Sequence, residues 1–365
     1  MDRYDELESK DTRVQALLDD QGLDALLLSR VSSFAWVTGG AASYVNTATD
    51  IGAATVLWTP HRKYVITDNI EAPRLRAEEG LKDLGFKFKV APWYEKDDVM
   101  AELTAGLKLG ADTPYPGAVD VSTEVGALRA RLTPAEGERF RQLGRLCADA
   151  VQAAVRAITP GQTEYEIAAQ LAAETLARGV LPTVNLIATD ERIFNFRHPL
   201  PTDRRLERYV MLVLCGRKWG LVCSVTRLVH FGSLPEELQR KMEAVARIDA
   251  TFIAATRPGG RIADIFQKAT QTYAEAGFPD EWQRHHQGGA AGYQPREYVA
   301  TLDSQEIVHE GQAFAWNPSI TGTKSEDTIL VGPEANEILT ATDDWPMAAV
   351  EVRGQAIPRP EILVV

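Results

Sequence analysis

The chain has 365 residues, a hydrophobic content of 45% and a formal net charge of -12, which suits a globular protein of about two domains. This negative charge repels a phosphate backbone, and no basic run offsets it, so we expect no nucleic-acid partner. The N-terminal segment MDRYDELESKDTRVQALL is charged throughout and no apolar run approaches the ~20 residues of a membrane span, which predicts a cytoplasmic protein with no membrane partner.

The first part of the chain alternates helical and strand signals in the way that βα units do. Residues 12–29 have the pattern of an amphipathic helix that leads into a buried strand. Four further apolar segments follow in the order FAWVTGG, AATVLWT, KYVITD and FKFKVAPWY. The pattern predicts a small α/β domain over residues 1–132.

A change of pattern after Leu132 marks the domain boundary. Thr133-Pro-Ala-Glu136 is a helix-start signal, and a long helix is expected to continue to about Ala157. Two later segments, ITPGQTEYEIAAQLAAETLARG and TRPGGRIADIFQKATQTYAEAG, superimpose at one constant offset. In each, a Pro-Gly turn ends one helix and a later glycine closes the next. This internal repeat predicts two equivalent halves.

Strand-like segments follow each helix pair. They are TVNLIAT, YVMLVLCGRK and GLVCSVTRLVHFG in the first half, and FAWNPSI and EDTILVG in the second. Helix pairs combined with antiparallel strands, present twice, predict an α+β domain over residues 133–365 with a cleft between its halves.

The order of these elements, together with RHPLPTDRRLER, HHQGGAAGYQPRE, NPSI and SEDTILV, resembles the creatinase, prolidase, aminopeptidase-P and methionine-aminopeptidase family. The resemblance covers nearly the whole chain. It implies the family's pita-bread fold for residues 133–365 and the smaller N-terminal domain of the prolidase, aminopeptidase-P and creatinase branch. It also implies a homodimer in which the N-terminal domain of one chain caps the cleft of the other.

Peptidases of this family hold two divalent metal ions with two Asp on the hairpin, a His in the glycine-rich loop and two late Glu, and the ion pair activates a water. By the resemblance, these positions correspond here to Val213, Ser224, Gly289, Asn317 and Glu326. Only Glu326 keeps the family's residue type. Because one carboxylate in five cannot hold a dinuclear centre, we expect no metal cofactor.

Several polar residues remain at positions that the resemblance links to substrate. His198 stands where creatinase, which hydrolyses a small amidino compound without metal, has its acid/base His. Glu326 is also kept in creatinase, and Arg296-Glu297 matches an Arg-Glu dipeptide there, whose Arg could bind a substrate carboxylate. The hairpin Glu of creatinase is replaced by Thr226, which weighs against creatinase activity itself.

Two classes of function follow from these residues. The first is a Xaa-Pro peptidase homologue that is inactive as a metallopeptidase and binds a small peptide-like or amino-acid ligand. The second is a metal-independent hydrolase of a small amidino or guanidino compound, with His198 and Glu326 as its catalytic residues. The residues predicted to contact the ligand are Ser224, Arg296, Glu297 and Asn317.

A third alternative is an active Xaa-Pro peptidase with substituted ligands. It would need His285 or His286 to replace the lost histidine and Asp327 to serve as a further carboxylate. Against it, residues 209–235 contain no Asp or Glu in any register of the hairpin. Adjacent residues also point apart in regular secondary structure, so we do not expect the two histidines to share an ion.

Overall fold

The computed structural model describes residues 3–342 and 344–365. The chain divides into two compact units. One runs to Glu136 and takes in Trp219–Leu221, and the other holds Gly137–Lys218 and Val222–Val365. Among the described residues, no helix combines the length and the apolar character that crossing a lipid bilayer requires.

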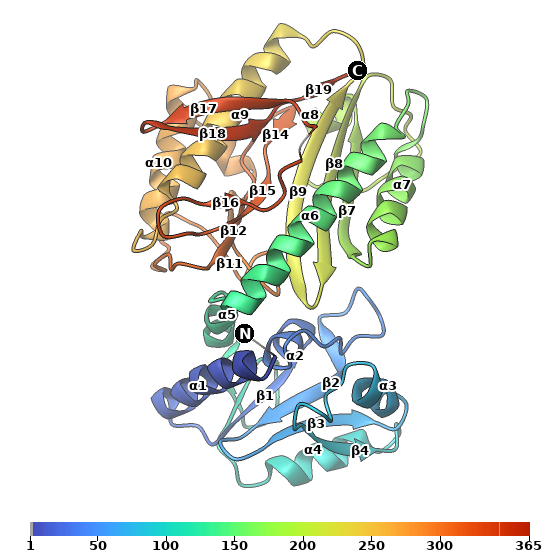
Figure 1. Cartoon of the computed structure of the whole chain (residues 1–365), viewed down its shortest axis with the longest axis vertical. Coiled ribbons are helices and arrows are strands. Elements are labelled where there is room, and N and C mark those ends of the chain that lie inside the picture. The colour runs from blue at the N-terminus through green and yellow to red at the C-terminus, as the bar shows by residue number, and fades with distance from the viewer. Residues whose placement is uncertain (1–2, 343) are drawn as a thin grey trace. The chain divides into compact units, whose positions relative to one another are not determined.

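The N-terminal unit is built on one six-stranded sheet in the order β4-β3-β2-β1-β5-β6 (Figure 1). Its strands are β1 (Ala25–Arg30), β2 (Ile51–Trp58), β3 (Lys63–Asp68), β4 (Lys87–Ala91), β5 (Leu109–Ala111) and β6 (Val119–Asp120). Its helices are α1 (Arg3–Gln21), α2 (Val31–Val37), α3 (Ala72–Ala77), α4 (Lys96–Thr104) and α5 (Ser122–Arg129). Because β1 is antiparallel to β2 and parallel to β5, the sheet is mixed.

Buried apolar side chains account for this α/β arrangement. Leu27, Leu57 and Ile66, from three neighbouring strands, belong to one core cluster. The apolar segment FAWVTGG lies mainly in α2, whose residues are all buried, whereas the other three predicted segments supply β2, β3 and β4. A short element buried on every side shows no helical periodicity, so its type is hard to predict from sequence.

The C-terminal unit contains the duplicated helix pairs that the repeat predicts. They are α6 (Pro134–Arg156) with α7 (Glu164–Ala177), and α9 (Glu236–Ala255) with α10 (Ile262–Glu275). Thr133 and Glu136 form the expected capping box at the start of α6, with hydrogen bonds of 2.6 and 3.3 Å. Gly161 and Gly259 adopt φ angles of +95° and +82° in the two Pro-Gly turns, a backbone region that favours glycine.

The strands of this unit form two larger sheets, in the orders β19-β9-β8-β7 and β11-β10-β12-β15-β16, and two hairpin ribbons, β13-β14 and β17-β18. The strands are β7 (Leu181–Thr189), β8 (Tyr209–Lys218), β9 (Leu221–His230), β10 (Gly288–Ala291), β11 (Tyr298–Val299), β12 (Ala313–Trp316), β13 (Ser319–Ile320), β14 (Thr323–Lys324), β15 (Asp327–Leu330), β16 (Glu337–Ile338), β17 (Met347–Val352), β18 (Gln355–Pro360) and β19 (Leu363–Val364). A short helix α8 (Glu191–Asn195) precedes β8, and a 3₁₀ helix η1 (Glu281–Arg284) precedes β10.

The predicted hairpin is formed by β8 and β9. Its turn residues Trp219 and Gly220 both have positive φ angles, 52° and 76°, as in the tight turns that match strand twist. Helix α6 lies against β8 (Figure 1), where a Cβ at Gly216 would come within 2.5 Å of the Sγ of Cys147. The glycine therefore lets the helix approach the sheet.

Candidate functional site

The two hairpin positions that the resemblance links to metal ligands lie in β8 and β9. Val213 is buried in β8, where it pairs with Leu186 of β7. Ser224 of β9 is fully buried, and its hydroxyl lies 3.2 Å from the Sγ of Cys215. The same hydroxyl accepts a hydrogen bond of 3.2 Å from Nη1 of Arg296. The hairpin thus presents one neutral hydroxyl at these two positions.

The carboxylate of Glu326 is buried and held by three donors. Its Oε1 accepts a hydrogen bond of 3.0 Å from Nη2 of Arg296. Its Oε2 accepts bonds of 2.6 Å from the Thr226 hydroxyl and 2.7 Å from Nζ of Lys324. Burial by itself raises the pKa of Glu326, but the positive charges of Lys324 and Arg296 outweigh burial and lower the pKa to about 2. The carboxylate is therefore ionised and is paired with two cations of its own chain.

Lys324 is a member of this site that the sequence motifs do not identify. Its signal in the sequence is the Lys-Ser-Glu spacing, because residues two apart in an extended chain lie on one face, which places Lys324 beside Glu326. Glu297, in contrast, is engaged by the backbone. Its Oε1 accepts hydrogen bonds from the amides of Tyr293 at 2.8 Å and Gln294 at 3.2 Å, which stabilises the turn after β10.

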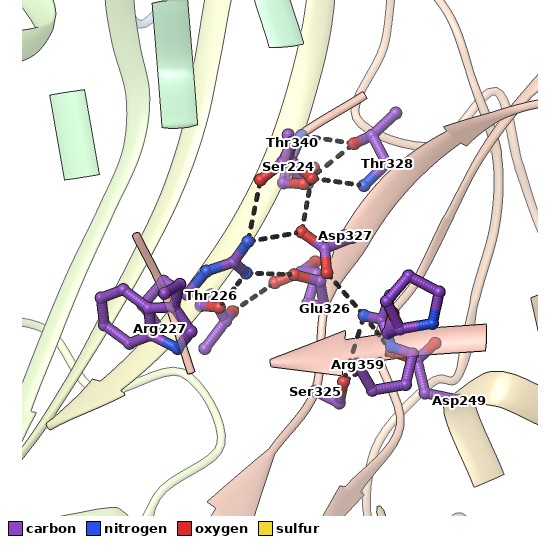
Figure 2. Close-up of polar contacts among 12 residues, drawn as sticks. Ser224, Thr226, Arg227, Asp249, Ser325, Glu326, Asp327, Thr328, Thr340 and Arg359 are labelled. Carbon is purple, nitrogen blue, oxygen red and sulfur yellow. Dashed lines mark hydrogen bonds and ion pairs between the residues drawn. The ribbon is translucent and has the colours of Figure 1, made fainter. Parts of the chain in front are cut away.

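Asp327 belongs to a buried network of polar groups that adjoins Glu326 through Arg227 (Figure 2). Its Oδ1 lies 2.9 Å from Nη2 of Arg227, and its Oδ2 lies 2.6 Å from Nη2 of Arg359. The same Arg359 nitrogen lies 2.6 Å from Oδ2 of Asp249. Both carboxylate oxygens of Asp327 are thus occupied by guanidinium groups.

Gly289 lies in β10, between β11 and β12. A Cβ atom at Gly289 would lie 2.1 Å from the carbonyl oxygen of Tyr298 and 3.1 Å from the backbone nitrogen of Ala300. These are backbone atoms and cannot rotate away, so the position has no room for a side chain. Asn317 follows β12 and is buried, and its backbone N–H donates to the carbonyl of Gln287 at 3.0 Å. Its Oδ1 has no hydrogen-bond partner among the residues that the structure describes.

Three histidines come together in the same unit. His198 follows α8, and the other two follow η1. Nε2 of His285 lies 3.0 Å from Nε2 of His198, and the ring centroids of His285 and His286 are 4.4 Å apart. The prediction that the two adjacent histidines point apart is therefore wrong. The two histidines lie between η1, which ends at Arg284, and β10, which begins at Gly288, so the alternation of a regular element does not apply to them.

Burial and nearby cations keep these three imidazoles neutral. Burial and then Lys324 lower the pKa of His198. The same two causes lower the pKa of His285 to about 2, and burial followed by Arg296 lowers the pKa of His286 to about 4. Each ring therefore has an unprotonated nitrogen at neutral pH, which can accept a hydrogen bond, a proton or a metal ion.

The structure brings most of the predicted site residues together. Direct hydrogen bonds connect Arg296 to Ser224 and to Glu326. His198 is close enough to this group for the charges of Glu326 and Arg296 to influence its pKa. The arrangement combines an ionised carboxylate, two cations and neutral imidazoles, which can bind a zwitterionic ligand and move a proton.

Comparisons with known proteins agree with this architecture. Residues 12–137 match the family model of the creatinase/prolidase N-terminal domain, and residues 138–333 match that of metallopeptidase family M24. The Xaa-Pro dipeptidase of Pyrococcus horikoshii is 22% identical over 358 residues, which cover 93% of this chain and 99% of that protein. An uncharacterized peptidase of Staphylococcus saprophyticus is 27% identical over 235 residues, which cover 60% of this chain and 65% of that protein.

Solved structures show the same fold. The Xaa-Pro dipeptidase from Bacillus anthracis superimposes with a TM-score of 0.80 at 19% identity, and the match covers 98% of this chain and 100% of that one. The predicted α+β class, with a pita-bread C-terminal domain and a smaller α/β N-terminal domain, is confirmed. Because the matched residues 138–333 make up over half of the chain, it belongs to metallopeptidase family M24, with a creatinase/prolidase N-terminal domain.

Proposed function

We propose that this chain is a Xaa-Pro peptidase homologue with a dismantled dinuclear metal site, and that it binds a small peptide-like or amino-acid ligand without acting as a metallopeptidase. One observation carries the proposal. Glu326, the one family carboxylate that remains, is ion-paired at 3.0 Å to Arg296 and at 2.7 Å to Lys324. Two side-chain cations thus neutralise the carboxylate that a metal ion would neutralise in a peptidase.

The donor set does not fit a pair of divalent ions. Such ions need several oxygen or nitrogen ligands around each metal, and among the five family positions only Glu326 offers an anion. A divalent ion beside Glu326 would also be repelled by Arg296 and Lys324. The histidine position is closed as well, because a side chain at Gly289 would collide with the backbone of Tyr298.

The same charges favour a ligand that carries a carboxylate. Arg296 and Lys324 together carry two positive charges against the single negative charge of Glu326. Dipeptides and amino acids end in a carboxylate, and charge-assisted hydrogen bonds to Arg or Lys are about twice as strong as neutral ones. The buried Oδ1 of Asn317, which has no hydrogen-bond partner within residues 3–342 and 344–365, would in turn accept a hydrogen bond from a ligand amine or amide.

Calorimetric titration with Ala-Pro and with its C-terminal amide tests this function. We expect the acid to bind at least about tenfold more tightly than the amide, and Lys324→Met to remove most of that difference. Lys268→Met, a lysine of α10 outside the site, is the matched control. In parallel, Ala-Pro and a longer Xaa-Pro peptide are incubated with the protein and Mn²⁺, Co²⁺ or Zn²⁺. Metal-dependent hydrolysis would refute the proposal and establish an active peptidase with substituted ligands.

A second candidate function is metal-independent hydrolysis of a small amidino or guanidino compound. It is favoured by His198, because burial and Lys324 lower its pKa and leave a neutral imidazole that can act as a general base. The Thr226 hydroxyl, which donates to Glu326 where creatinase has a second carboxylate, weighs against it. This candidate requires turnover of creatine or a related guanidino acid that persists in EDTA and is abolished by His198→Ala.

A further inference from the structure

His198, His285 and His286 offer ring nitrogens that all lie within 4.8 Å of one another. None of the three stands at one of the five family ligand positions. We propose that this cluster is a separate site for one borderline divalent transition-metal ion, of the class of Zn²⁺, Ni²⁺, Co²⁺ or Cu²⁺. Imidazole nitrogen is a preferred ligand of these ions, whereas Mn²⁺ and Mg²⁺ prefer oxygen.

The distances between the rings are close to those of a bound state. With metal–nitrogen bonds of about 2.0–2.1 Å, two imidazoles on one tetrahedral ion have their nitrogens roughly 3.3 Å apart. His198 and His285 already lie at 3.0 Å. The ring centroids of His198 and His286 are 5.9 Å apart, and both side chains are exposed. These two rings can therefore rotate to close the remaining distance.

Ion pairing and hydrogen bonding hold the two histidine-bearing segments in place. Arg197, which precedes His198, forms an ion pair of 2.6 Å with Glu281 of η1. Nε2 of Gln287 donates to the carbonyl oxygen of His285 at 2.5 Å. These contacts fix the backbone of the two segments that carry the rings. Because the folded chain already holds these two segments, ordering the histidines costs less free energy when a metal ion binds.

The surroundings of the cluster define what would complete the coordination. His198 and His286 are each partly exposed and leave one side of the cluster open to solvent, so a fourth position is free for water or an exogenous ligand. The positive charge of Lys324 acts on His285 and His286, and that of Arg296 acts on His286. Their charges disfavour a bare cation and favour an anionic fourth ligand, such as a carboxylate.

Metal titration of protein prepared without a polyhistidine tag tests the site. After treatment with EDTA and removal of the chelator, the chain is titrated with Zn²⁺ and Ni²⁺ by calorimetry and with Co²⁺ by visible absorption. We expect one equivalent per chain, and binding at least about tenfold weaker in His286→Ala and in His198→Ala. His61→Ala, at an exposed histidine between β2 and β3, should bind as the unmodified chain does.

Three outcomes would overturn the site. One is the absence of stoichiometric binding to the unmodified chain, and another is unchanged binding in both His286→Ala and His198→Ala. The third is Mn²⁺ binding as tight as Zn²⁺ binding, which would indicate oxygen ligands. Thermal unfolding of each metal-free variant verifies that it is folded. Because neither peptide hydrolysis nor peptide binding is measured, this result is independent of the proposed function.

Discussion

Replacing Gly289 by alanine tests whether the family's histidine position is closed in this chain. The added Cβ would lie 2.1 Å from the carbonyl oxygen of Tyr298, where ordinary contact begins at 3.4 Å, so the oxygen would have to retreat by about 1.3 Å. That oxygen belongs to β11, which pairs with β10 through Gly289 and Val299 and through Ala290 and Tyr298. The retreat would therefore disturb backbone hydrogen bonds between the two strands.

The expected loss of stability follows from these contacts. Overpacking of a tight site costs about 1–3 kcal/mol, and each weakened backbone hydrogen bond adds about 1 kcal/mol. We expect the free energy of unfolding to fall by about 3 kcal/mol and the Tm to fall by roughly 10 °C for a domain of this size. Gly137→Ala is the matched control, because its Cβ would make ordinary contacts with the side chains of Leu330 at 3.7 Å and Arg141 at 4.0 Å. Alanine in α6 should be neutral or stabilise by up to about 1 kcal/mol.

Urea denaturation and scanning calorimetry at pH 7 measure both variants against the unmodified chain. Gly289→His should be destabilised at least as much as Gly289→Ala and should gain no Mn²⁺ binding. If Gly289→Ala unfolds at the same midpoint as Gly137→Ala and the unmodified chain, β11 leaves room for a side chain. The reasoning that the histidine position is closed would then be wrong.

Two further substitutions test the buried ion pairs. Glu326→Gln should lower the free energy of unfolding by about 3 kcal/mol at pH 7, because it leaves two buried cations without a partner. Since the pKa of Glu326 is lower in the folded chain, at about 2, than its ordinary 4.5, its contribution is present above pH 4.5 and is lost as the pH falls toward 2. The difference between the two proteins in urea denaturation should thus shrink by about 1 kcal/mol between pH 7 and 3.5, and a constant difference would contradict this. Arg359→Met should cost about 3–5 kcal/mol in the same assay, because its two carboxylate partners stay buried. Arg240→Met, at an exposed pair, should leave the free energy of unfolding nearly unchanged, and an effect equal to that of Arg359→Met would refute the difference between buried and exposed pairs.

Local patterns in the sequence predicted much of this fold. The Pro-Gly repeat gave the two helix pairs, because glycine is favoured at the positive φ of Gly161 and Gly259 whatever surrounds them. The capping box of Thr133 and Glu136 likewise depends on residues three apart. The absence of Asp and Glu from residues 209–235 can likewise be seen in the sequence itself. All of these signals lie within short stretches of chain, where bonding geometry and periodicity act directly.

The contacts that decide the chemistry join segments that are distant in the chain, and only the tertiary structure brings them together. Arg296 reaches Ser224 across 72 positions, and His285 reaches His198 across 87. The closure at Gly289 depends on how near β11 lies, which the residue itself does not encode. The two adjacent histidines share one side in the segment between η1 and β10, which belongs to neither element. The sequence thus determined that the hairpin carries no carboxylate, and the folding of the chain decided which cations and imidazoles lie near Glu326.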